Sequence, residues 1–61
     1  MSEKIAEKTY KNKLYLLHHD DKHGYLISII NSIGIMVECL YFKTLEIAQE
    51  WFDGIGKKND E

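Results

Sequence analysis

The fold is decided by a continuous stretch at residues 25–53, which reads YLISIINSIGIMVECLYFKTLEIAQEWFD. Residues 25–31 and 35–42 are rich in aromatic and β-branched side chains, which favour strands. The sequence NSIG at residues 31–34 separates them and is typical of a turn. Because this connection is short, we expect the two strands to pair antiparallel.

A helix is predicted directly after these strands, over residues 45–53. Thr44 has a side-chain oxygen suited to capping the first turn, and Glu46 places a negative charge where the helix dipole favours it. Gly54 ends the helix, because glycine readily leaves the helical conformation. Apolar side chains recur at helical spacing and predict one buried face: Leu45, Ala48, Phe52 and Ile55.

The segment before this stretch adds one more predicted strand. Residues 11–18 read KNKLYLLH and favour a strand, and residues 19–24 read HDDKHG and favour a polar loop. Residues 1–9 contain few apolar side chains, so we expect them to be frayed or to form a short helix. The predicted fold is therefore α+β, a three-stranded antiparallel meander followed by a helix packed on one sheet face.

The length of the chain, 61 residues, suffices for one small domain. We expect that domain to span residues 1–61, with its core at residues 10–56 and a disordered tail at residues 57–61. Met1, Ser2 and the charged end look like natural termini, so we expect a complete small protein.

Apolar side chains on both sides of the predicted sheet indicate an interaction surface. Side chains alternate between the two faces of a strand, and one helix covers one face. The face expected under the helix carries Tyr25, Ile27, Ile29, Ile35, Val37, Cys39 and Tyr41. The opposite face carries the candidate interface: Leu26, Ile30, Met36, Glu38 and Leu40. An uncovered apolar face of this kind marks an interface, unless the N-terminal segment folds over it or the sheet curls.

Composition argues against several classes of protein. The chain has 8 basic residues, all lysine, 10 acidic residues and a formal charge of −2, which does not favour nucleic-acid binding. Its one cysteine, Cys39, rules out a disulfide within the chain and fits a reducing, cytoplasmic compartment. No signal segment is visible, and polar residues interrupt the apolar region at residues 25–42, so we expect no membrane span.

Neither an enzyme nor a cofactor is expected. Cys39 lies in the middle of a predicted strand, where a buried thiol is inert, and the sequence shows no Ser/His/Asp arrangement or glycine-rich phosphate loop. The densest polar cluster comprises His18, His19, His23, Asp20 and Asp21. These side chains are ligand types for zinc, copper or nickel, but their spacing matches no standard zinc site. We interpret the cluster as a solvated hairpin tip, with metal binding as the alternative.

The junction between the last strand and the helix resembles that of AP2-like DNA-binding domains at the N-termini of tyrosine integrases. The match is an F-K-T-x-x-x-A-x-x-W pattern, formed by Phe42, Lys43, Thr44, Ala48 and Trp51. The resemblance covers residues 11–55 and implies three antiparallel strands followed by a helix. Members of that family read DNA with basic residues on the sheet, where this chain has Leu26, Ser28, Met36 and Glu38. The lack of basic residues at these positions argues against DNA binding. DNA binding is therefore an alternative function and not the main expectation.

A looser similarity connects the chain with HicB-like antitoxin domains. It rests on two segments, DKHGY at residues 21–25 and TLEIA at residues 44–48. The proline-containing turn typical of that family is missing, because the chain contains no proline.

We expect a small acidic protein-interaction module with a regulatory or inhibitory role. Carboxylates on its surface can meet the lysine and arginine side chains of a protein partner; the candidates are Asp20, Asp21, Glu46, Glu50 and Asp53. Many Lys, Ile and Asn residues without Arg suggest an AT-rich coding sequence, and hence a phage or mobile element acting on host or defence machinery. The alternatives are the AP2-like DNA-binding module and a homodimer joined through strand edges or the uncovered sheet face.

Overall fold

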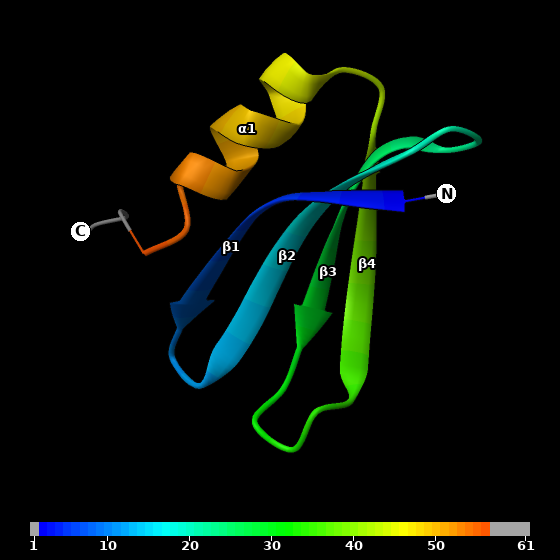
Figure 1. The fold of residues 1–61 in the computed structure, drawn as a ribbon. Helices are drawn as coiled ribbons and strands as arrows, with labels where there is room; N and C mark the ends of the chain where they lie inside the picture. The colour runs from blue at the N-terminus through cyan, green and yellow to red at the C-terminus, as the bar shows by residue number, and fades with distance from the viewer. Residues whose placement is uncertain (1, 57–61) are drawn as a thin grey trace.

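The computed structural model describes residues 2–56, which form a four-stranded sheet and a helix (Figure 1). In chain order the elements are β1 (Ser2–Tyr10), β2 (Lys13–Asp20), β3 (Gly24–Ile30), β4 (Met36–Phe42) and α1 (Leu45–Asp53). The strands lie in the order β1-β2-β3-β4, and successive strands pair antiparallel. The fold is therefore α+β as predicted, but with four strands instead of three. The tail expected at residues 57–61 lies outside the described residues.

The additional strand is β1, the segment that we expected to be frayed or helical, and that expectation was wrong. β1 pairs with β2 as far as Tyr10, which lies opposite Lys13. Between these two residues, Lys11 and Asn12 both have positive φ angles, of 52° and 67°. Positive φ at both central residues is characteristic of the type I′ turn, whose twist matches that of a two-stranded hairpin.

The turn between β3 and β4 is closed by the side chain of Asn31. Its Oδ1 accepts hydrogen bonds from the backbone N–H groups of Ile33 and Ile35, at 3.1 and 3.0 Å. The backbone N–H of Asn31 donates to the carbonyl oxygen of Ile35 at 2.9 Å. Asparagine favours such turns because its short side chain reaches the backbone nearby. The structure thus contains the predicted turn at residues 31–34.

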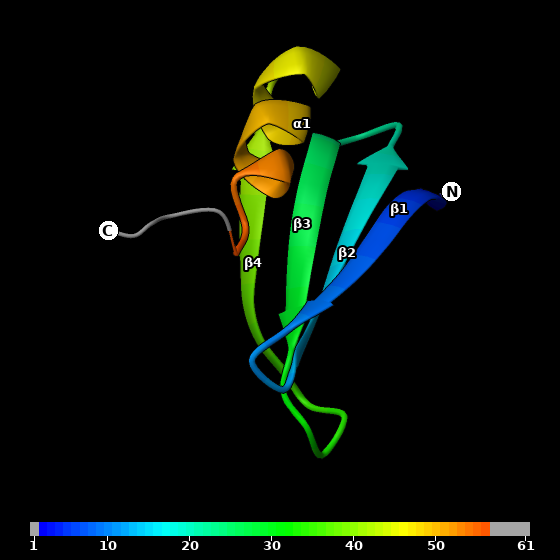
Figure 2. The same cartoon turned by 90° about the vertical axis from the view of Figure 1, so that its left-hand side faces the viewer.

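α1 covers one face of the sheet (Figure 2) and buries Ala48 and Phe52 against it. The Oγ1 of Thr44 accepts a hydrogen bond from the backbone N–H of Ile47 at 3.3 Å, so Thr44 is the predicted N-cap. The same two features, a capping threonine and apolar residues at helical spacing, therefore define both the predicted helix and the observed one.

The core is centred on Leu17 and Ile27, whose side chains are fully buried. Complete burial of an aliphatic side chain of this size stabilises a fold by about 1.5–3 kcal/mol. Trp51 of α1 extends the core, because its ring centroid lies 6.2 Å from that of Phe42 and 6.4 Å from that of Tyr15. Trp51 itself remains 40% exposed, so the rim of the core under α1 is open to solvent.

Candidate interaction surface

The register of the strands decides which side chains share a face, because directly opposite residues in an antiparallel pair point to the same side. Ile27 lies opposite Leu17 and Leu40, on the face covered by α1. Ser28 lies opposite Leu16 and Cys39, on the other face. We call this other face the open face; on β2, β3 and β4 it carries Leu14, Leu16, His18, Leu26, Ser28, Ile30, Met36, Cys39 and Tyr41.

The predicted interface residues are divided between the two faces. Those that lie on the open face, as predicted, are Leu26, Ile30 and Met36. The predicted face was wrong for the other two residues. Leu40 packs against the buried core on the α1 side, and Glu38 lies opposite the buried Ile29 on that same side.

A bulge in β4 explains this error. Met36 lies opposite Ile30, whereas Glu38 lies opposite Ile29, so one step along β3 corresponds to two steps along β4. The extra residue is Val37, and it reverses the alternation of side chains over the rest of the strand. Two residues that we expected in the core consequently lie on the open face: Cys39 and Tyr41.

The centre of the open face is covered by the sheet's own side chains. Ser28 is 8% exposed, and Leu16, Leu26 and Ile30 around it are half-buried. Both views show that the sheet is twisted (Figures 1 and 2). The N-terminal segment does not fold over this face, because it pairs with β2 at the edge of the sheet. The exposed large apolar side chains of the open face therefore lie on β4, at Met36 and Tyr41.

The most exposed large apolar side chains of residues 2–56 lie on β4 and on the loop before it. We call them the β4 patch: Ile33, Ile35, Met36, Val37 and Tyr41, which are 74, 56, 57, 52 and 60% exposed. β4 is also an edge strand, since β3 is the one strand paired with it among residues 2–56. An edge strand presents a row of backbone N–H and C=O groups that no neighbouring strand uses. Apolar side chains and backbone hydrogen-bonding groups are thus presented together.

Tyr41 lies close to groups on its own strand and on the neighbouring turn. The Cys39 thiol, two residues earlier on the same face, raises the pKa of the Tyr41 hydroxyl through a hydrogen bond and through its charge. The ring of His23 lies 5.6 Å from the Tyr41 ring, between centroids. Tyr41 nevertheless remains 60% exposed on the open face.

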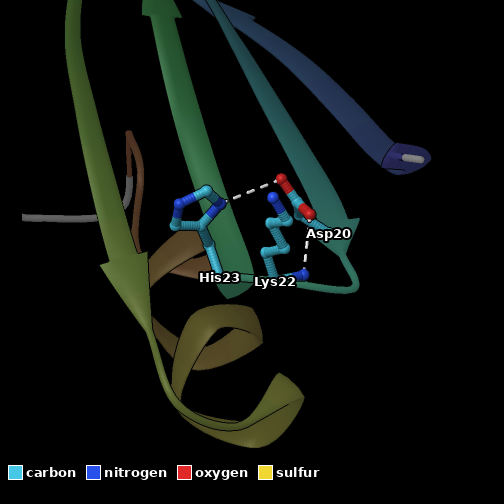
Figure 3. A network of polar contacts seen from close by, with 3 residues as sticks. All are labelled: Asp20, Lys22 and His23. Carbon is cyan, nitrogen blue, oxygen red and sulfur yellow. Dashed lines mark hydrogen bonds and ion pairs between the residues drawn. The ribbon is translucent and has the colours of Figure 1, made fainter.

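The histidine and aspartate cluster lies at the end of β2 and in the turn that follows, where Asp20 contacts Lys22 and His23 (Figure 3). The Asp20 carboxylate accepts a hydrogen bond from the backbone N–H of Lys22 at 2.9 Å, and it lies 3.1 Å from Nδ1 of His23. These two hydrogen bonds lower the pKa of the Asp20 carboxyl group, and the bond from the Lys22 N–H has the larger effect. A further ring contact joins His19 to Tyr25, with centroids 4.7 Å apart. The arrangement stabilises the hairpin tip.

The predicted alternative role of this cluster, metal binding, has no geometric support in the described part of the chain. Within residues 2–56, no group of three His, Cys, Asp or Glu side chains is placed to hold one ion. The carboxylate of Asp20 serves the turn instead, because it bonds to Lys22 and His23.

The predicted acidic residues come from two elements. Asp20 and Asp21 belong to the β2–β3 hairpin, at the end of the sheet where β4 leads into α1. The other three are exposed on α1, and we call them the acidic stripe: Glu46, Glu50 and Asp53. Spacings of four and three residues place them along one side of the helix. The structure thus brings three of the five carboxylates into one row.

Comparisons with protein-family models, with curated proteins and with solved structures find no match for this chain. The resemblances to AP2-like and HicB-like domains therefore remain predictions. In the described part of the chain, α1 lacks the length and apolar character that a membrane-crossing helix requires.

Proposed function

We propose that this chain is a protein-interaction module that binds a protein partner through the β4 patch. The observation that carries the proposal is the exposure of five large apolar side chains on β4 and its preceding loop, from 52% for Val37 to 74% for Ile33. Soluble monomers seldom expose large apolar surfaces, and those that do commonly use them for binding.

The energetics require that a partner cover most of the β4 patch at once. Complete burial of an Ile, Val or Met side chain is favourable by about 1.5–3 kcal/mol, and half-exposed residues have roughly half of this left to gain. Association costs about 4–15 kcal/mol in lost freedom of the two molecules. One or two contacts are therefore too weak, and a partner must cover the whole patch and also pair with the backbone edge of β4 to offset this cost.

The acidic stripe supports a partner with a basic surface. Glu46, Glu50 and Asp53 are exposed along one side of α1, and a row of like charges attracts a basic partner over a distance. Such attraction raises the association rate more than the final affinity. A small acidic module that occupies a basic surface fits a regulatory or inhibitory role, and we include this role in the proposal.

The proposal is tested by capturing partners from extracts of the source cells with variants that add one positive charge. Tyr41→Lys places the charge in the β4 patch, and Thr9→Lys places it at an exposed position of β1, the other edge strand. We expect the wild type and Thr9→Lys to capture the same protein and Tyr41→Lys to lose it. Equal capture by all three, with folding confirmed by circular dichroism, contradicts the proposal.

The DNA-binding alternative requires a separate measurement. Lys4 lies opposite His18 at the margin of the open face, but its ammonium group pairs with the Glu7 carboxylate at 2.6 Å. Since the net charge of the chain is also −2, we expect no binding to duplex DNA at about 50 mM salt. Fluorescence anisotropy that rises with added protein and falls with added salt would support DNA binding instead.

A further inference from the structure

The two edges of the sheet differ in how well they are protected against pairing with another strand. β1 has a bulge between Lys4 and Ala6 and carries the charged residues Glu3, Lys4, Glu7 and Lys8. Charges and bulges of this kind block edge-to-edge pairing. β4 carries one charge, on Glu38, and its bulge lies at its beginning. Residues 38–42 therefore form a regular edge with little protection.

We infer that β4 pairs antiparallel with β4 of a second copy of this chain, which joins two four-stranded sheets into one continuous sheet. The inference rests on the proposed function, because it uses Tyr41 of the β4 patch and the backbone edge of β4. An open strand edge favours pairing with another extended strand, since that strand can form hydrogen bonds with the N–H and C=O groups of the edge.

The residues of β4 are complementary to themselves in this arrangement. Full overlap of residues 38–42 places the two-fold axis at Leu40, which then lies opposite Leu40 of the second copy. Cys39 lies opposite Tyr41 of the second copy, and Glu38 lies opposite its Phe42. The carboxylates of the two Glu38 residues are therefore not directly opposed.

The position of α1 fits the same arrangement. Figure 2 shows α1 over the end of β4 that leads into the helix, while the end of β4 that follows the 31–35 loop is bare. Antiparallel pairing about a two-fold axis perpendicular to the sheet keeps both helices on one face. It also sets each α1 beside the bare end of the other β4. Ile47 and Trp51, which are 51% and 40% exposed, belong to the helix that approaches that bare end.

Self-pairing of one short strand buries less surface than a stable dimer interface, so we expect a weak dimer. A dimer with a Kd of about 1 mM has a favourable association free energy of about 4 kcal/mol. Analytical ultracentrifugation at chain concentrations up to about 1 mM detects a dimer as weak as this. We expect the mass of the wild type and of Thr9→Lys to rise towards twice the monomer value. Tyr41→Lys should weaken association by about tenfold or more, since two lysines enter one symmetric interface.

A second measurement tests the register. In the proposed pairing, Tyr41→Cys places a thiol directly opposite Cys39 of the second copy, with Cα atoms about 4.5–5.5 Å apart, which suits a disulfide. We expect diamide, added to the folded Tyr41→Cys variant, to oxidise the two facing thiols and give a covalent dimer. Thr9→Cys, which also carries two thiols but places the new one on β1, should remain largely monomeric under the same treatment.

The outcomes separate this inference from the proposed function. A monomer at every concentration, or equal cross-linking of Tyr41→Cys and Thr9→Cys, overturns the pairing of β4 with itself. The proposed function still stands if that monomer captures a different protein and Tyr41→Lys loses it. Conversely, a dimer weakened by Tyr41→Lys supports the self-pairing even where no other protein is captured.

Discussion

The ammonium group of Lys8 on β1 donates a hydrogen bond to the backbone carbonyl oxygen of Phe52 in α1, over 3.0 Å. It also reaches the carbonyl oxygen of Ile55 at 3.4 Å and lies 5.2 Å from the centre of the Phe52 ring. The last turn of α1 has no basic residue of its own. A lysine from the first strand thus supplies the positive charge that the C-terminal end of a helix favours.

Lys8→Met should lower the free energy of unfolding by about 1–2 kcal/mol. Methionine keeps the apolar stem but leaves the partly buried carbonyl oxygens of Phe52 and Ile55 without this donor. Lys4→Met is the matched control, because Lys4 makes an exposed ion pair with Glu7 and such pairs contribute about 0–1 kcal/mol. Urea denaturation compares the two variants, and an equal loss in both would show that Lys8 does not stabilise the helix end.

Gly24→Ala should destabilise the protein more than Gly34→Ala. Both glycines have positive φ, 84° and 87°, so alanine is strained at either position by about 1–2 kcal/mol. A Cβ at Gly24 would also lie 3.1 Å from the carbonyl oxygen of Phe42, whereas a Cβ at Gly34 meets nothing within 4 Å. Thermal unfolding of the two variants gives the difference directly. Equal melting temperatures would mean that the Gly24 turn moves away from Phe42 without cost.

Asp20→Asn should make stability less sensitive to acid. The Lys22 N–H and His23 lower the pKa of Asp20 in the folded protein, so its contribution is present above the ordinary value of 3.8 and is lost as pH falls through the lowered pKa. The melting temperature of the wild type should therefore fall more steeply than that of Asp20→Asn below about pH 4. Equal slopes for the two proteins in this pH range would contradict the contribution of the Asp20 carboxylate.

β1 shows why one strand was not predicted from the sequence. Ser2–Tyr10 is mostly polar, which suggested fraying, yet at an edge only alternate side chains need to face the core. Ala6 packs on the core, and Lys8 points to the same side to bond with α1. Asn12 was the overlooked signal, because asparagine tolerates the positive φ of a tight hairpin turn.

β4 shows the opposite case, where the strand was predicted but its faces were not. Residues 35–42 are apolar at almost every position, so alternation alone does not tell which side chains face the helix. The bulge at Val37 then changes the alternation within the strand, and its position depends on the pairing with β3. For this reason Met36 was placed correctly, whereas Leu40 and Tyr41 were interchanged between core and surface.

Asn12→Gly should stabilise the β1–β2 hairpin, and Asn12→Val should weaken it. The φ of 67° at Asn12 is readily adopted by glycine, tolerated by asparagine and strongly disfavoured by a β-branched residue. Because glycine also makes the unfolded chain more flexible, the gain should be small, about 0.5 kcal/mol, while the valine variant should lose about 1–2 kcal/mol. Urea denaturation measures both changes. The decisive comparison is their order: a valine variant as stable as the glycine variant would exclude a type I′ turn at Lys11 and Asn12, and with it the pairing that makes β1 the fourth strand.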